Sequence, residues 1–231
     1  MTLEVLPDPE AAAKRAAAII AQDARAAVAA RGKFTMAVSG GHTPWLMLRA
    51  LANEDVPWAG VQIFQVDERV APEGDPDRNL THLRATLLTN APISSEQIYA
   101  MPVELPDVEA AARKYAQTLN TVIGSPPVLD LSHLGLGPDG HTASLVPGDP
   151  VLDITNSDVG VTGVYNGHRR MTLTYPVLNR SRKILWLVTG AEKVAMLPRL
   201  ETGDTSIPAG RISRPQAVVV ADRAATGRAG S

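Results

Sequence analysis

The segment Phe34 to Asn53, FTMAVSGGHTPWLMLRALAN, indicates the architecture of this protein. Its first residues, FTMAV, are apolar and partly β-branched, which predicts a short buried strand. Its last residues, WLMLRALAN, have apolar side chains at helical spacing, with Thr43 suited to the N-cap and Pro44 to the first helical position. Between them lies a loop with two adjacent glycines. The stretch therefore predicts a strand, a loop and a helix, which is the repeating unit of an α/β fold.

The alternation of strand and helix continues on both sides of this unit. The Ala-rich stretch 9–31 predicts a surface helix that ends near Gly32. Further strands are predicted at 61–66, 128–136, 183–190 and 216–222, and further helices at 80–89, 108–124 and 191–201. Because the strands are almost continuously apolar, they favour a mostly parallel sheet with helices on both faces, a Rossmann-like three-layer arrangement. No linker divides the chain, so we predict a single α/β domain over residues 1–231.

Composition narrows the function classes. The chain has 22 Lys and Arg residues against 24 Asp and Glu, a formal net charge of −2, so nothing in its charge favours nucleic acid or a membrane surface as partner. It has no cysteine, which excludes disulfides, thiolate catalysis and thiolate metal sites. The N-terminus lacks the pattern of a signal peptide, and no apolar run approaches the roughly 20 residues that span a bilayer. We expect a soluble, cytoplasmic protein, a monomer or weak dimer, with a small-molecule partner.

Ligands of such folds bind at the carboxyl ends of the strands, so the loops there are the candidate sites. The first is Ser39-Gly40-Gly41-His42-Thr43. Glycines allow close approach of the backbone, the hydroxyls can donate, and the next helix begins with free N–H groups, which together favour a phosphate site. The loop is not a Walker A motif, because G-x-x-x-x-G-K-[ST] is absent. The alternative is a tight turn that requires glycine for its geometry alone.

Two further loops carry cations. Asp67-Glu68-Arg69 follows the strand 61–66, and Arg69 could pair with a phosphate or carboxylate in bidentate fashion. The alternative is a solvated run of charges. Lys193 is predicted in the first turn of the helix 191–201, where a cation opposes the helix dipole unless an anion is bound. The alternative there is an ordinary surface lysine.

The remaining loop is GLGPDGHTASLVPG, Gly135 to Gly148, whose glycines match the dinucleotide-binding pattern G-x-G-x-x-G. That motif needs a long helix after its third glycine, but Pro147 and Pro150 leave room for about one turn. Asp158 stands near the expected position of a ribose-binding carboxylate, in a segment that reads poorly as a strand. We therefore reject the dinucleotide interpretation.

The glycines are better interpreted as shaping a rigid loop that presents Asp139 and His141. Histidine is the side chain best suited to general acid–base catalysis near neutral pH. The histidines His82 and His133 are expected to be structural, on the surface and in a strand respectively.

The motifs SGGHTP, DERVAPEGDPDRN, GLGPDGHTASLVPG, RMTLT and TGAEK, in this order and followed by IPAGRI, resemble the 6-phosphogluconolactonase family. The resemblance spans residues 34–222 and implies an isomerase-type α/β fold. The related glucosamine-6-phosphate isomerase/deaminase shares that fold, but it usually has a tyrosine at the position of Arg69. It also has a glutamate before the Pro-Gly of the loop Gly135–Gly148, hereafter the third loop, where TASLVPG has no carboxylate.

The resemblance implies that His141 is the catalytic base and that Asp139 organises it. It implies that Arg69 and Lys193 hold a substrate phosphate together with backbone groups of Ser39–Thr43, with Arg170 as a further anion contact. Asp67 is expected to line the same site. This chain departs from the family pattern at three positions. The family often has Ser or Gly at the position of His42, Ser at the position of Arg78 and Phe at the position of Val146.

The implied reaction is hydrolysis of 6-phospho-D-glucono-1,5-lactone to 6-phospho-D-gluconate in the oxidative pentose phosphate pathway. A δ-lactone is an activated ester, so no cofactor, metal or covalent nucleophile is expected. N–H groups near Gly137 to His141 are the expected donors to the oxyanion. The alternatives are a sugar-phosphate isomerase/deaminase and a non-catalytic sugar-phosphate-binding regulator.

Overall fold

A parallel sheet forms the centre of the molecule. The computed structural model describes residues 1–227, and the last four residues of the predicted domain, 228–231, lie outside the described residues. Seven strands pair in parallel. In spatial order they are β1 (Thr2–Leu6), β10 (Ala217–Asp222), β9 (Ile184–Val188), β6 (Leu131–Leu134), β2 (Phe34–Val38), β3 (Val61–Gln65) and β5 (Ile98–Tyr99). The predicted mostly parallel sheet is confirmed, whereas its two edge strands, β1 and β5, were not predicted.

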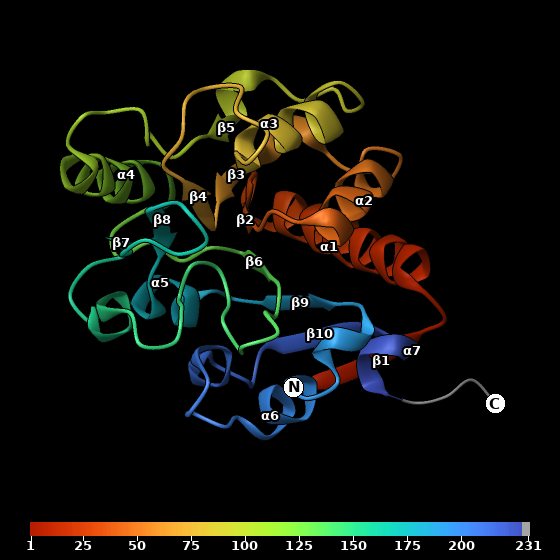
Figure 1. The fold of residues 1–231 in the computed structure, drawn as a ribbon. Helices are drawn as coiled ribbons and strands as arrows, with labels where there is room; N and C mark the ends of the chain where they lie inside the picture. Colours follow the sequence, from red (N-terminus) through yellow and green to blue (C-terminus); the bar gives the residue numbers. More distant parts are fainter. Residues whose placement is uncertain (228–231) are drawn as a thin grey trace.

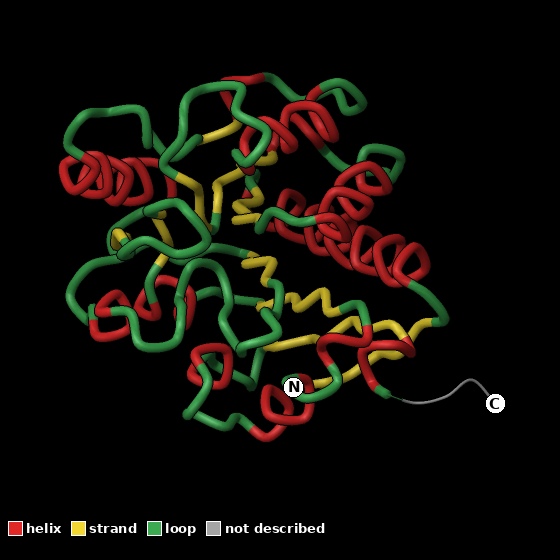
Figure 2. The backbone as a smooth tube through the Cα atoms, in the orientation of Figure 1, coloured by secondary structure: helices red, strands yellow, loops and turns green. Residues whose placement is uncertain are grey.

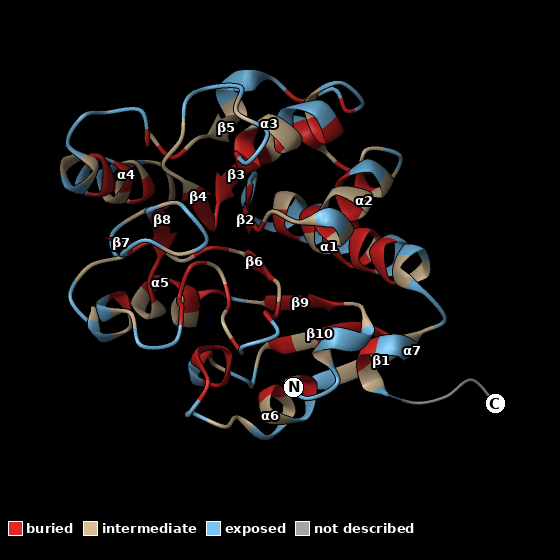
Figure 3. Cartoon of the chain, viewed as in Figure 1, coloured by how far each residue is buried: buried red, intermediate tan, exposed pale blue. Residues whose placement is uncertain are grey.

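Helices cover both faces of this sheet (Figure 1). The helices α1 (Pro9–Arg31), α2 (His42–Leu51) and α3 (Asn79–Leu83) lie on one face, and α4 (Val108–Ile123), α5 (Tyr175–Arg180) and α6 (Leu197–Thr202) on the other, with α7 (Arg223–Thr226) after β10. Successive strand residues alternate between two cores, since Met36 and Val38 pack with α1 while Ala37 packs with α4. Figure 3 shows the result, with buried strands and helices exposed on their outer sides. The three-layer prediction is confirmed.

A second, antiparallel sheet stands beside the main one. It consists of β4 (Asp67–Arg69), β8 (Arg170–Leu173) and β7 (Val159–Val161), in the order β4-β8-β7. The prediction of a loop from residue 67 is therefore wrong for the first three positions. The partner of β4 lies far along the chain, so the local pattern of Asp67-Glu68-Arg69 contains no sign of the pairing.

Two predicted helix boundaries are wrong. Helix α2 begins at His42 with Gly41 as its N-cap, and Thr43 is not the cap. The helix expected over 191–201 is broken into a 3₁₀ turn, Ala191–Lys193, and the helix α6 from Leu197. Pro198 explains the break, because proline is tolerated in the first turn of a helix but not in the interior of a longer one. Lys193 thus precedes α6 and does not lie in its first turn.

Candidate active site

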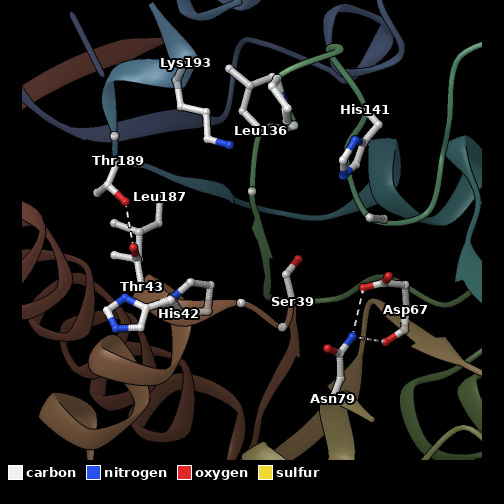
Figure 4. A pocket seen from close by; sticks show the side chains of 18 of the residues that line it. Ser39, His42, Thr43, Asp67, Asn79, Leu136, His141, Leu187, Thr189 and Lys193 are labelled. Atoms are coloured by element: carbon white, nitrogen blue, oxygen red, sulfur yellow. Dashed lines mark hydrogen bonds between the residues drawn. The ribbon is translucent and has the colours of Figure 1, made fainter. Parts of the chain in front are cut away.

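A cleft of about 480 Å³ lies at the carboxyl ends of β2, β6 and β9 (Figure 4). Residues of β4 and β8 also line it. The predicted binding residues and the predicted base all line this cleft: Ser39, Gly40, Gly41, His42, Thr43, Asp67, Arg69, His141, Arg170 and Lys193. Asp139 is not among the lining residues, although it is hydrogen-bonded to His141. The imidazole of His42 is exposed and is turned away from His141 in Figure 4.

The loop Ser39–Thr43, hereafter the glycine loop, rests on a rigid support. The backbone N–H of Ser39 donates to Nδ1 of His133 at 3.3 Å, and its Oγ donates to the carbonyl of His133 at 2.9 Å. His133 is fully buried, and burial lowers the pKa of its imidazole to about 3, so it is neutral at physiological pH. A Cβ on Gly40 would lie 1.8 Å from Oδ1 of Asn79, so only glycine fits there. The first residue of the loop is therefore fixed before any ligand binds.

Cations lie on both sides of the glycine loop. The guanidinium of Arg69 donates from Nη1 to Oδ1 of Asn79, the atom that packs against the loop. On the other side, Oγ1 of Thr43 shares a hydrogen bond of 2.6 Å with Oγ1 of Thr189, at the end of β9. Lys193 follows Thr189 shortly along the chain, and Figure 4 shows its ammonium group pointing into the cleft. This arrangement suits an anion bound to the loop.

The charged run after β3 is buried and ordered. The carboxylate of Asp67 accepts from Oγ of Ser144 at 2.6 Å, and Nδ2 of Asn79 donates to the backbone carbonyl of Asp67 at 2.9 Å. Glu68 is completely buried, and its Oε1 accepts the backbone N–H groups of Arg69 and Asn79, both at 2.8 Å. The alternative of a solvated charge run is wrong for Asp67 and Glu68.

Two arginines face each other across the small sheet. Arg69 of β4 pairs directly with Arg170 of β8. Like charges at directly opposite positions destabilise an antiparallel pair. Burial, and next the charge of Arg69, lowers the pKa of Arg170, and its Nε is buried with no hydrogen-bond partner among the described residues. An anion bound between the two guanidinium groups would relieve this repulsion.

Asp139 and His141 form a hydrogen-bonded pair. Nδ1 of His141 lies 2.6 Å from Oδ1 of Asp139, and the backbone N–H of His141 donates to the same oxygen at 3.1 Å. Burial raises the pKa of the Asp139 carboxyl, but the donors of His141 and the hydroxyl of Tyr165 outweigh it and lower the pKa overall. Because an ionised carboxylate only accepts, the imidazole proton lies on Nδ1, which leaves Nε2 free to act as a base. Figure 4 shows the ring pointing into the cleft.

Gly137 of the third loop leaves room for this pair. A Cβ on Gly137 would lie 2.1 Å from Nδ1 of His141 and 2.7 Å from Oδ1 of Asp139. Between β6 and β7 the chain is loop except for the helical turn Pro150–Asp153 (Figure 2), so the helix that a dinucleotide site needs does not follow. The prediction that Pro147 and Pro150 leave room for about one helical turn is confirmed.

The expectation that N–H groups of this loop donate to the oxyanion is wrong at Gly137, Gly140 and His141. The N–H of Gly137 donates to the carbonyl of His141 at 2.8 Å, and that of Gly140 to the carbonyl of Gly137 at 3.0 Å. The N–H of His141 is bound to Asp139. These groups hold the loop in shape, because a short loop with many glycines needs internal hydrogen bonds to satisfy its backbone.

Several site residues were missed by sequence reasoning. They are Asn79, Ser144, Tyr165 and Thr189. For Tyr165 a signal existed, since the following Asn166-Gly167 has positive φ at both residues, 49° and 84°, as in the two-residue turns of tight hairpins. The turn could be predicted from that dipeptide, but its position against Asp139 could not.

Within residues 1–227, neither a cluster of metal-ligand side chains nor a helix able to cross a membrane is found. No group of three or more His, Asp and Glu side chains there is arranged to hold a metal ion. None of the helices in that same part of the chain is both long and apolar enough to cross a membrane.

Comparison with known proteins gives a consistent result. The family model for glucosamine-6-phosphate isomerases/6-phosphogluconolactonase matches residues 7–221. Proteins named 6-phosphogluconolactonase from Mycobacterium tuberculosis and Nostoc sp. are 36% and 35% identical, covering 98% and 93% of this chain and 98% and 92% of their own. The crystal structure of 6-phosphogluconolactonase from Thermotoga maritima matches with a TM-score of 0.84 and 27% identity, over 96% of this chain and 98% of that one.

A monomeric glucosamine-6-phosphate deaminase has the same fold, with a TM-score of 0.85 at 19% identity over 98% of this chain and 99% of its own. The fold is thus shared by both branches of the group, while the curated sequence relatives above bear the lactonase name. The chain belongs to the glucosamine-6-phosphate isomerase/6-phosphogluconolactonase family.

Proposed function

We propose that this protein is a lactonase that hydrolyses 6-phospho-D-glucono-1,5-lactone to 6-phospho-D-gluconate in the oxidative pentose phosphate pathway, and that it works as a single domain. The observation that carries the proposal is the Asp139–His141 pair at a cleft flanked by Arg69, Arg170 and Lys193. Relatives that are 33–36% identical over most of the chain bear this name. A cytoplasmic location and a monomeric or weakly dimeric state are part of the proposal, and sedimentation of the purified protein would test the second.

His141 acts as the general base. Nε2 removes a proton from water as the water oxygen bonds to C1 of the lactone, and the carbonyl oxygen takes up the negative charge. The tetrahedral intermediate then collapses, the bond from C1 to the ring oxygen breaks, and the imidazolium returns the proton to that oxygen. Asp139 holds Nδ1 and stabilises the positive charge that the imidazole carries between these steps.

The glycine loop, Arg69 and Lys193 bind the phosphate. The support for this is the position of the two cations on either side of the loop, through Asn79 and through the Thr43–Thr189 bond. Helix α2 begins inside the loop, so its first N–H groups add a partial positive charge. Phosphate binding places C1 at the base. The contacts that do this are made to the phosphate, away from the reacting carbon.

Arg170 is proposed as the second anion contact, between the phosphate and the base. Arg170 is paired with Arg69 across the small sheet, and its guanidinium lies over the ring of Tyr165. Tyr165 in turn contacts Asp139. Since three backbone N–H groups of the third loop are already bonded, a guanidinium is the better candidate to stabilise the C1 oxyanion.

The test is acid release from freshly prepared 6-phosphogluconolactone, at a pH where spontaneous hydrolysis is slow. We expect rapid turnover by the wild type. His141→Ala should lower kcat by about 10² to 10⁴ with little change in KM, the usual contribution of a general base.

Other outcomes would contradict the proposal. If His141→Ala kept the wild-type kcat, His141 would not be the base. If the wild type left the lactone untouched but formed fructose 6-phosphate from glucosamine 6-phosphate, the protein would be a deaminase. Binding of either substrate without turnover would indicate a regulator.

A further inference from the structure

The hydroxyl of Tyr165 binds the carboxylate that holds the base. It donates to Oδ2 of Asp139 at 3.1 Å, while Oδ1 of the same carboxylate receives Nδ1 of His141 at 2.6 Å. The carboxylate is thus held from both sides, by the imidazole and by the phenol. Without Tyr165, only His141 would fix its orientation among the contacts described.

The ring of Tyr165 contacts two functional side chains. Its edge packs against the imidazole of His141, with ring centroids 5.6 Å apart and planes at 69°. The guanidinium carbon of Arg170 lies 5.1 Å from its centroid, within the range of a cation–π contact. One aromatic side chain therefore lies between the base and a cation of the anion site.

The position of Tyr165 is fixed by a tight hairpin. Its N–H donates to the carbonyl of His168 at 2.9 Å, and the N–H of His168 donates back at 3.3 Å. Nε2 of His168 lies 3.1 Å from Oδ2 of Asp77, which ties the hairpin to the loop before α3. Val164, the neighbouring residue, is 73% exposed, so the hairpin directs its hydrophobic residue outward and the tyrosine inward.

We propose that Tyr165 is a positioning residue of the reaction: its hydroxyl orients Asp139 so that His141 stays in the reactive tautomer, and its ring holds Arg170 at the anion site. The proposal rests on the proposed function, with His141 as the base. The titratable and charged groups that face the phenol are the Asp139 carboxylate, the His141 imidazole and the Arg170 guanidinium.

The hydroxyl also moderates the charge of the carboxylate. The Tyr165 hydroxyl donates to Oδ2 and so takes up part of the negative charge of the Asp139 carboxylate. That charge would otherwise stabilise a protonated His141 imidazole next to Oδ1. Removal of the hydroxyl strengthens that stabilisation, so the protonated enzyme persists to higher pH. A residue with a purely structural role would not shift the pH dependence of the rate.

The experiment compares Tyr165→Phe and Tyr165→Leu on 6-phosphogluconolactone, with spontaneous hydrolysis subtracted at each pH. Tyr165→Phe keeps the ring and loses the hydroxyl. We expect kcat to fall roughly three- to tenfold, as for loss of one hydrogen bond, with KM unchanged and the acid limb of kcat/KM moved to higher pH. Tyr165→Leu should show the same changes and in addition a severalfold higher KM, because Arg170 loses the ring.

The control is Tyr175→Phe, which removes a hydroxyl bond of 3.0 Å to the carbonyl of Pro208 and leaves Asp139 untouched. It should keep the wild-type pH profile. If Tyr165→Phe also kept the wild-type kcat and pH profile while His141→Ala was inactive, the role of Tyr165 would be overturned and the proposed function would stand. If His141→Ala retained full activity, the proposed function itself would fail.

Discussion

One wall of the cleft is made of loops that leave the parallel sheet, and the other is made of the small antiparallel sheet. On the first wall, buried polar contacts between neighbouring loops and strands hold the glycine loop and the Asp139–His141 pair. On the second, Arg69 and Arg170 stand opposite each other, and Nε of Arg170 has no partner among the described residues. The first wall is therefore organised in advance, while the second becomes electrostatically satisfied only with an anion in place.

The difference indicates how the two walls divide the reaction. A base needs a fixed tautomer and direction, which internal hydrogen bonds supply. A binding site for a dianion needs uncompensated positive charge, and its cost to the free protein is repulsion between the cations. Mutations that displace the Asp139–His141 pair should accordingly change kcat, and mutation of Arg69 should change KM.

After His141→Ala, the largest effect is expected from Gly137→Ala on the first wall. The added Cβ would overlap Nδ1 of His141, at 2.1 Å, so the base must move. A displacement of about 1 Å can lower kcat on the order of 10²-fold. Gly135→Ala is the matched control in the same loop, because a Cβ there meets nothing within 4 Å, and it should keep most of the activity. Similar kcat values for the two variants would show that the first wall is not rigid.

The next effect is expected from Arg69→Ala on the second wall. Loss of a charge-assisted bond to phosphate should raise KM about tenfold or more, with a smaller change in kcat. Steady-state kinetics on the lactone measure both constants. Arg84→Ala, which removes an exposed guanidinium paired with Glu73, is the control and should leave KM unchanged. A fall in kcat alone for Arg69→Ala would contradict the proposed division between the walls.

The smallest effect concerns the support beneath the glycine loop. The folded protein keeps the buried His133 neutral down to a pKa of about 3, whereas the unfolded chain takes up a proton near pH 6.5. The free energy of unfolding therefore decreases as the pH falls below 6.5, by about 1 to 2 kcal/mol between pH 6.5 and 5.

Urea unfolding at pH 7 and pH 5 measures this loss. His133→Gln should show a weaker pH dependence than the wild type, and His42→Gln, at an exposed position, should match the wild type. Equal slopes for the wild type and His133→Gln would mean that the imidazole beneath Ser39 can be protonated in the folded protein.

The first wall could be predicted in large part from local sequence. Strand, loop and helix signals lie next to each other at Phe34–Leu51, and a strand signal directly precedes the loop of Asp139 and His141, so the residues that follow each strand identify its functional end. The second wall could not be predicted in this way. The pairing of Asp67–Arg69 with Arg170–Thr172 joins segments far apart in the chain, and nothing local to either segment indicates the partner.

The same distinction explains the errors at individual residues. Thr43 lies inside α2 rather than at its N-cap, and its hydroxyl is bound to Thr189, a contact between distant segments. Tyr165 was missed because its role depends on where a predictable turn lies against another loop. Which predicted site residues act in catalysis stays a prediction that the kinetic experiments will test.

The buried carboxylate of Glu68 has a consequence for how this site can change. One of its oxygens receives the N–H groups of both Arg69 and Asn79, so the two ends of the intervening loop are joined at a single atom. The exposed stretch Pro72–Gly74 belongs to this loop, whose two ends are joined at Glu68. Insertions or deletions there alter the length of the loop without moving its ends, at a closure cost that grows only slowly with length. This loop is thereby free to vary in length while the arginine and asparagine at its base keep their places.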